Sequence, residues 1–140
     1  MQLAKYIGEN LKSDCVIEML EHFDMSVMYD FDRSHENTPD SYSSAAKGAG
    51  FEIRFNDYQI LDVIWCYVEP RDGFSRVNRE LIGASIPPNF AAAKSHAVKS
   101  SVQLSESKDQ ASWLCLKYEN LWIHYEFSSD QLTLVTFMLK

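Results

Sequence analysis

The residues that could carry out chemistry are few in this sequence, and most of them stand far apart. The four histidines are scattered, and the phosphate-binding loop G-x-x-x-x-G-K-[ST], the nucleophile motif G-x-S-x-G and the zinc motif H-E-x-x-H are all missing. Cys115 could face His124 across a hairpin, as a nucleophile faces its base, but chance explains such a pairing well enough. The residue types therefore predict that the chain is not an enzyme, with no catalytic residues and no bound cofactor.

A cation site would need carboxylates or imidazoles at ligand spacing, and one segment comes near to this. Asp30 and Asp32 are followed by His35 and Glu36. The spacing does not fit an EF-hand, because the glycine and the final glutamate that such a loop requires are missing. We therefore expect a solvated acidic loop after Asp30, with no bound metal.

Negative charge is concentrated at the start of the chain. Residues 1–40 contribute −6 to the net charge of −7, since nine acids there stand against three bases. Such a field repels nucleic acid and anionic membranes, and it attracts basic surfaces. A small patch of Arg71, Arg76 and Arg79 does not reverse this balance. We expect no nucleic-acid or membrane partner, and the acidity serves either solubility or docking to a basic protein.

The cysteines and the apolar runs bear on the cellular compartment. Cys15, Cys66 and Cys115 are odd in number and widely spaced, which favours reduced thiols. The N-terminal segment lacks the apolar core of a signal peptide, and no run reaches the roughly 18 apolar residues of a membrane span. These features predict a cytoplasmic location.

Periodicity predicts short helices and antiparallel strands. Apolar and polar residues alternate in 51–55, as in a half-buried strand, whereas 60–68 is apolar on both sides, as in a central strand. Helices are expected at 2–9, at 13–23 and from residue 90, and strands near 26–31, 42–46, 112–118, 121–127 and 132–139. A short strand near Leu81 and a loop at 105–110 complete the prediction.

A weak internal repeat relates the two halves of the chain. With a shift of 71 residues, Phe51 meets Trp122 and Cys66 meets Phe137. Either the two halves are a true structural duplication, or two unrelated hairpins have similar sequences because they pack in the same way. The prediction is an α+β fold with a mainly antiparallel sheet and helices on one face. Residues 1–140 are expected to form a single domain with halves 1–80 and 81–140.

One face of such a sheet is expected to remain uncovered, because the sequence has only about three helical segments. Trp122, His124 and Glu126 alternate with apolar neighbours and would lie on that face. Tryptophan among charged residues is typical of protein-binding surfaces. Trp65 and Tyr67, from the strand that is apolar on both sides, are expected in the core instead.

A second set of candidate contact residues is acidic. Asp14, Glu18 and Glu21 fall on one side of the helix predicted at 13–23, opposite its apolar side. This stripe is either a solvated outer face or a docking surface for a basic partner. The candidates are those three residues with the acids that follow them: Asp14, Glu18, Glu21, Asp30, Asp32 and Asp40.

The second half of the chain resembles a group of small bacterial immunity proteins. The resemblance lies in the Pro87-Pro88 turn, the helix from Phe90, the polar loop that follows, and a strand with Trp113 and Tyr118 that opens a three-stranded meander. In the first half, KGAGFEIRFNDYQILDVIWCYV is similar to the Gly-Phe strand and hairpin of the same group. The helix, loop and three-strand unit also resembles the repeat of β-lactamase-inhibitor-like domains.

The resemblance implies a protein that binds rather than one that turns over a substrate. Proteins of the first group neutralise toxin domains delivered by contact-dependent growth inhibition systems and bacteriocins. The implied partner is a cognate toxin domain, commonly a nuclease. An acidic protein would occlude the basic active-site surface of such a nuclease, and the expected complex contains one toxin domain and one monomer of this chain. A secretion or effector chaperone is the alternative, and a small hydrolase is a more distant one.

Overall fold

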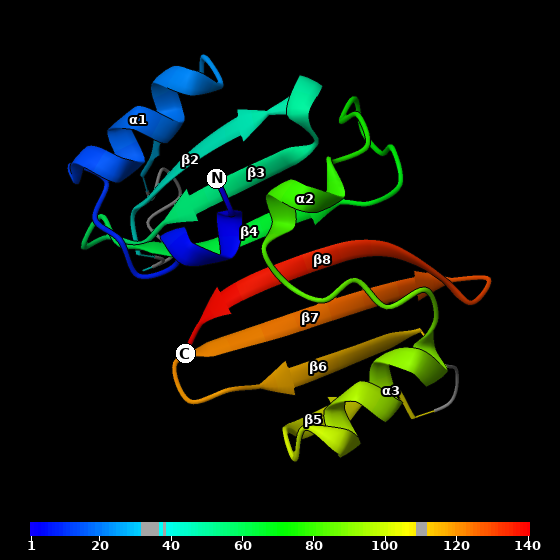
Figure 1. Cartoon of the computed structure of the whole chain (residues 1–140). Helices are drawn as coiled ribbons and strands as arrows, with labels where there is room; N and C mark the ends of the chain where they lie inside the picture. Colours follow the sequence, from blue (N-terminus) through cyan, green and yellow to red (C-terminus); the bar gives the residue numbers. More distant parts are fainter. Residues whose placement is uncertain (32–36, 38, 109–111) are drawn as a thin grey trace.

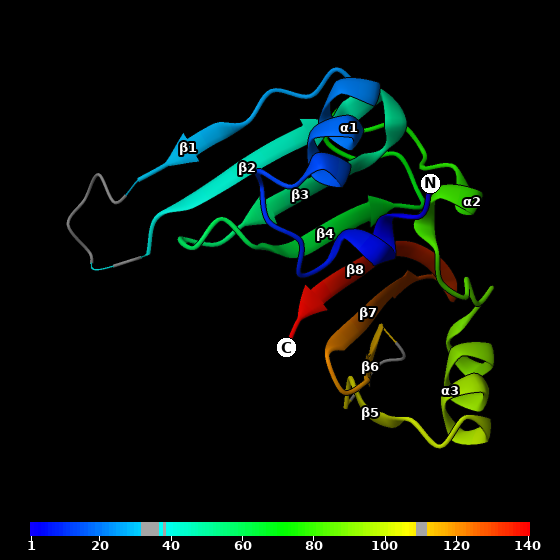
Figure 2. The ribbon, with the colours of Figure 1, turned by 60° about the vertical axis from the view of Figure 1, so that its left-hand side comes forward.

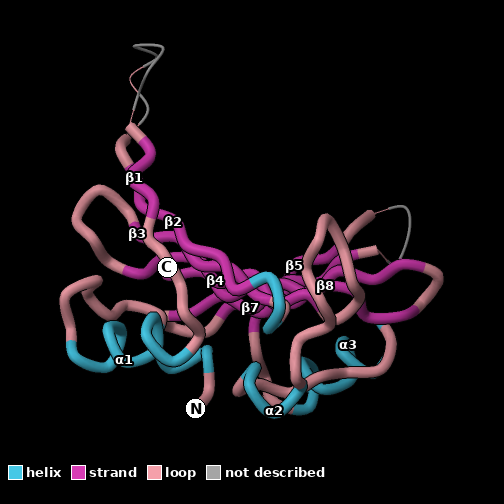
Figure 3. The backbone as a smooth tube through the Cα atoms, turned by 90° about the horizontal axis from the view of Figure 1, so that it is seen from above, coloured by secondary structure: helices cyan, strands magenta, loops and turns pink. Residues whose placement is uncertain are grey.

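The computed structural model describes residues 1–31, 37, 39–108 and 112–140. Its strands form one antiparallel sheet with the order β1-β2-β3-β4-β8-β7-β6-β5, and α1, α2 and α3 all lie on one face of it (Figures 1 and 3). We call the opposite face, which carries no α-helix among the described residues, the helix-free face. The predicted α+β class, with a mainly antiparallel sheet and helices on one face, is confirmed.

The sequence predicted most of these elements close to their observed positions. The strands are β1 (Met28–Asp30), β2 (Ser41–Ala46), β3 (Phe51–Phe55), β4 (Leu61–Tyr67), β5 (Gln103–Glu106), β6 (Trp113–Lys117), β7 (Leu121–Ser128) and β8 (Gln131–Leu139). The α-helices are α1 (Asp14–His22), α2 (Arg79–Ile82) and α3 (Phe90–Lys99), and the 3-10 helices are η1 (Leu3–Tyr6) and η2 (Lys47–Ala49).

Local chemistry explains why the two longer helices form and where they pack. In α1, Val16 and Met19 are buried while the acidic side faces solvent, as its amphipathic pattern predicts. In α3, the Asn89 side chain accepts a hydrogen bond of 2.9 Å from the Ala92 N–H and caps the first turn. The buried side of α3 is Ala93 and Ala97, whose small side chains allow the helix to lie close to the sheet.

The core lies between the sheet and these helices. Every second residue along the strands points into it, so Ile53 of β3 lies beside Ile64 of β4, and Ile64 lies beside Phe137 of β8. All three side chains are fully buried. The core continues into the second half of the chain through Leu114 and Tyr125, and one cluster of buried side chains therefore joins both halves.

The two halves of the sheet have matching hairpins. Ile53 pairs with Ile64 in the β3–β4 hairpin, and Tyr125 pairs with Val135 in the β7–β8 hairpin. Each hairpin has a register shift at the corresponding place, before Phe55 in the first and before Phe127 in the second. The hairpins meet where β4 pairs with β8, and an approximate twofold relation therefore connects them.

The 71-residue offset of the sequence repeat is correct for β4 and β8, but it is one residue too short for β3 and β7. The offset is 71 residues between Ile64 and Val135, but 72 between Ile53 and Tyr125, because the second hairpin has the shorter turn. At an offset of 71, Phe51 was matched with Trp122, yet Phe51 lies on the core side and Trp122 on the helix-free face.

Two predicted elements were wrong. The strand expected near Leu81 is the helix α2, which the Asn78 side chain caps by accepting a hydrogen bond of 3.0 Å from the Glu80 N–H. The loop expected at 105–110 begins inside β5, while residues 109 and 110 lie outside the described ranges. The sequence did not predict β5, because Gln-Leu-Ser-Glu has one apolar residue and none of the β-branched or aromatic residues that favour strands.

Candidate protein-binding face

The helix-free face gathers all three tryptophans of the chain. Trp65 comes from β4, Trp113 from β6 and Trp122 from β7, and each occupies the position between core-facing neighbours. All three are partly buried. Thr136, which pairs with Trp65 on one side and His124 on the other, is only 5 % exposed although no α-helix covers this face within the described residues. The tryptophans therefore keep part of their surface open to a partner on this face.

The tryptophans of the second half are held by ring contacts. The rings of Trp113 and His124 stack, with 5.5 Å between their centroids. The Lys117 ammonium lies 4.7 Å from the centroid of the Trp122 ring, which is cation–π geometry. The indole N–H of Trp122 donates to no acceptor among the described residues, so packing and Lys117 set the orientation of this ring. Such pre-positioned aromatic side chains lose little freedom when a partner covers them.

Cys115 and His124 lie opposite each other on this face, as the hairpin pattern suggested. Burial raises the pKa of the Cys115 thiol although Lys117 acts in the opposite direction, and burial lowers the pKa of His124 although Glu126 acts in the opposite direction. Both groups are therefore neutral at neutral pH, whereas an activated cysteine nucleophile is a thiolate with a lowered pKa. The His124 ring is also engaged with Trp113.

Trp65 lies on the helix-free face, and its predicted place in the core was wrong. Strand β4 is apolar on both sides, so alternation of apolar and polar residues could not assign Trp65 to a face of the sheet. Ile64 and Cys66 pair with core residues of β8, and Trp65 between them therefore points to the helix-free face. There it packs against Tyr67, Phe74 and Leu134. Phe74 comes from the loop after β4, and its ring stacks on that of Tyr67 at 4.4 Å.

This loop is anchored to the sheet at Gly50. The N–H of Ser75 donates to the Lys47 carbonyl, and the N–H of Val77 donates to the Tyr67 carbonyl, each at 2.8 Å. Gly50 has a φ of +81°, and a Cβ built on it would meet the Ser75 carbonyl oxygen and lie 2.5 Å from the Val77 nitrogen. Glycine is needed both for this conformation and for the close approach of the loop.

The first half of the helix-free face is lined mainly by carboxylates. Arg54 forms an ion pair of 2.9 Å with Asp62, and Glu52 accepts a hydrogen bond of 2.8 Å from the Tyr67 hydroxyl. A hollow of about 410 Å³ beside them is lined by two further carboxylates, Asp40 and Asp57. Arg54 is the one arginine among the described residues here and it is already paired with Asp62, so the described part of this end of the face carries a net negative charge.

The structure separates the acidic candidates into two groups. Asp14, Glu18 and Glu21 are exposed on α1, which covers the face of the sheet opposite to the tryptophans. Asp30 and Asp40 belong to the β1–β2 hairpin, where Ser43 donates to Asp30 at 2.8 Å and the Tyr29 hydroxyl donates to Asp40. Asp32 lies outside the described residues. A flat partner on the helix-free face would therefore not reach the stripe on α1.

Trp122, His124 and Glu126 lie on one face of β7, as the sequence predicted, and the structure adds neighbours that the sequence did not select. Trp113 on β6 pairs with Glu126 of β7. Trp65 on β4 pairs with Thr136 of β8, the strand that lies between β4 and β7. The alternation in 112–118 could have identified Trp113, because Leu114 and Leu116 point into the core. Trp65 required the strand pairing itself.

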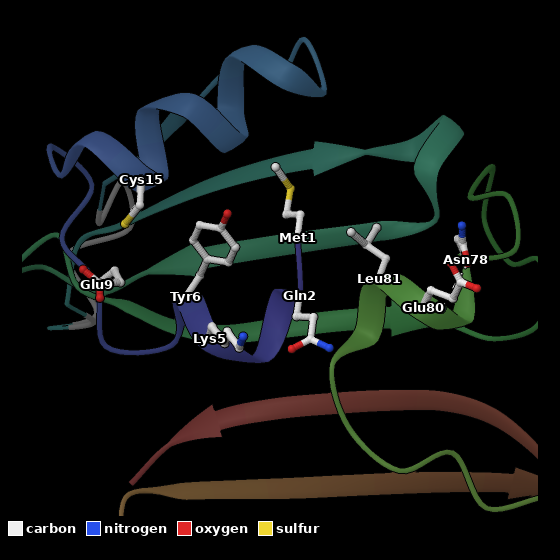
Figure 4. Close-up of a pocket in the computed structure, with 9 residues that line it drawn as sticks. All are labelled: Met1, Gln2, Lys5, Tyr6, Glu9, Cys15, Asn78, Glu80 and Leu81. Carbon is white, nitrogen blue, oxygen red and sulfur yellow. Dashed lines mark hydrogen bonds between the residues drawn. The ribbon is translucent and has the colours of Figure 1, made fainter.

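Another hollow lies on the opposite side of the molecule, between the N-terminal segment, α1 and α2 (Figure 4). It measures about 820 Å³, and Figure 4 shows Cys15 and Glu9 at one end with Glu80 at the other. Within the described ranges, its lining contains one thiol and two carboxylates but no histidine that could activate the thiol.

The described residues contain neither a metal-ligand cluster nor a helix able to span a membrane. No group of three or more histidine, cysteine or acidic side chains in the described ranges is arranged to hold a metal ion. Of the segment considered for a cation, Asp32, His35 and Glu36 lie outside those ranges. None of the helices that the structure describes is long and apolar enough to cross a membrane.

Comparison of the chain with protein families, with curated proteins and with solved structures found no match.

Proposed function

We propose that this protein is an immunity protein that binds a cognate toxin domain and blocks its activity. The observation that carries the proposal is the helix-free face, where Trp65, Trp113 and Trp122 are gathered beside a carboxylate-lined half. Aromatic residues in a pre-positioned patch are the residues that dominate binding energy in protein interfaces. The resemblance of both halves to small bacterial immunity proteins supports the same role.

Charge complementarity indicates what kind of surface the partner presents. The chain carries a net charge of −7, of which residues 1–40 contribute −6. A toxin that acts on nucleic acid needs a basic surface to hold phosphate, and an acidic protein would be steered towards that surface. The proposed partner is accordingly a toxin domain with a basic surface, bound 1:1 in the cytoplasm.

The test uses the C-terminal domain encoded by the gene that immediately precedes this one. Co-expression of the chain should restore growth to cells that produce this domain, and the purified pair should elute as a 1:1 complex. A Trp122→Ala chain should protect poorly. Growth arrest that the wild-type chain does not relieve, without complex formation, would disprove the immunity function. A complex in which a dimer of this chain holds an unfolded segment would instead identify a secretion chaperone.

A further inference from the structure

The two edges of the sheet are protected very differently. At one edge, β5 lies under α3, where Lys94 forms an ion pair of 3.0 Å with Glu106 and Leu104 packs against the core. At the other edge, β1 and the adjoining end of β2 project beyond the helices (Figures 2 and 3). All three residues of β1 are exposed, and no described strand lies along its outer side.

The exposed edge is apolar and aromatic. Met28 is 65 % exposed, Tyr29 49 % and Phe31 50 %. The Tyr29 ring packs between its neighbours, with its centroid 5.0 Å from that of Tyr42 and 5.9 Å from that of Phe31. Edge strands usually avoid pairing by means of lysine, proline or a covering element, and residues 27–31 contain neither lysine nor proline.

The negative charge around β1 favours a basic segment as the strand that pairs with it. Residues 21–46 contain six acids and one base. The Asp30 carboxylate is held on β1 by Ser43, and the Asp40 carboxylate is held beside Tyr29 by its hydroxyl. A second copy of this chain would bring the same carboxylates and another net charge of −7 to the edge, and the two copies would repel each other.

A hollow next to β1 on the helix-free face fits the same kind of partner. It measures about 450 Å³, and its floor is made by the small residues Ser43 and Ala45. Met28 closes it on the side of β1, while Asp24 and Glu52 supply carboxylates at its rim. Among the residues that the structure describes, no lysine or arginine lines this hollow. It could therefore take the ammonium or guanidinium group of an incoming side chain.

We infer that the outer edge of β1 is a strand-addition site, at which an extended basic segment of the toxin domain pairs with residues 27–31 as a ninth strand. Main-chain hydrogen bonds would supply affinity, and alternate side chains of the added strand would reach the aromatic cluster or the carboxylates. The inference rests on the proposed function, since it names the part of this chain that the toxin domain contacts in addition to the tryptophan face.

Hydrogen exchange tests the inference directly. Amides of residues 27–30 that point away from β2 should exchange quickly in the chain alone. They should slow by about tenfold or more in the complex with the C-terminal domain of the preceding gene. If the complex forms but these amides exchange at the rate of the free chain, the strand-addition site is wrong and the immunity function stands. If no complex forms, both fail together.

Two charge reversals provide a matched comparison that does not depend on the exchange data. Asp30→Lys places a positive charge on the proposed site, whereas Glu18→Lys makes the same change on α1, across the sheet. We expect Asp30→Lys to weaken affinity by about tenfold or more, and Glu18→Lys by less than about threefold. Equal effects would overturn the inference. Slowed exchange at β1 on concentrating the chain alone would also overturn it, since a second copy would then occupy the edge.

Discussion

Trp65 and Thr136 lie directly opposite each other where the two halves of the sheet meet. Their side chains share the helix-free face, and the matched hairpins on either side make this pair the approximate centre of the molecule. Thr136 is almost completely buried although it carries a hydroxyl, while Trp65 packs against the cluster of Tyr67, Phe74 and Leu134. Trp65 therefore combines a structural contact with a position on the candidate binding face.

Replacing Trp65 with alanine should lower stability less than a comparable change in the core. A fully buried Phe→Ala change costs about 3–5 kcal/mol, and we expect that cost for Phe137, which is 0 % exposed. Trp65 is only partly buried, and we expect Trp65→Ala to cost about 1–3 kcal/mol. Urea unfolding of the two variants beside the wild type measures both. A loss at Trp65 as large as that at Phe137 would mean that the face is more enclosed than its exposure indicates.

Truncation of Trp122 should separate binding from folding. Trp122→Ala removes a partly buried ring whose indole N–H has no acceptor among the described residues, and its melting temperature should stay within a few degrees of wild type. Affinity for the toxin domain should fall by roughly 30-fold, as for a central interface tryptophan worth about 2 kcal/mol.

Ile17→Ala is the control for Trp122, because Ile17 is an exposed apolar residue on α1, on the other face of the sheet. It should leave both melting temperature and affinity nearly unchanged. A Trp122→Ala chain that unfolds, or one that binds as well as Ile17→Ala, would move the binding site away from β7.

Gly50 and Gly48 offer a matched pair of alanine substitutions. Gly50→Ala should cost roughly 2–4 kcal/mol, because a positive φ and a clash with the backbone of residues 75–77 both oppose a Cβ. Gly48 has open space around it, and Gly48→Ala should change stability by less than about 1 kcal/mol. Chemical denaturation of the pair would contradict this account if the two variants were equally stable.

His124 should make the protein less stable as the pH falls. Burial lowers the pKa of His124 in the folded state, so the unfolded chain takes up this proton first as the pH drops through about 6.5. Stability is lost from there until the pH reaches the folded-state pKa. Glu126 opposes the shift, while Cys115 and Thr136, which face His124 from β6 and β8, are uncharged at neutral pH.

The variant His124→Gln should lose less stability than the wild type between pH 7.5 and pH 5. Urea unfolding of both chains at the two pH values measures the difference, and the other three histidines, present in both, cancel in the comparison. Equal losses in the two chains would show that His124 is not responsible.

The sequence by itself determined the features that depend on neighbouring residues. Alternation along a strand assigns each side chain to one of two faces, and Trp122, His124 and Glu126 could therefore be separated from their core-facing neighbours before any pairing was known. The amphipathic pattern of α1 and the Asn89 cap of α3 are likewise local. The excess of acids in the first forty residues follows directly from the amino-acid composition of that segment.

The tertiary structure decided what depends on contacts between distant segments. β4 is apolar on both sides, so its own residues do not choose a face. Only its pairing with β8, some seventy residues later, sets Trp65 on the same face as Trp122. The exposure of β1 has the same kind of cause, since a strand becomes an edge only when the order of all eight is fixed. Periodicity reports the direction of a side chain, whereas strand order is chosen by the packing of the whole core.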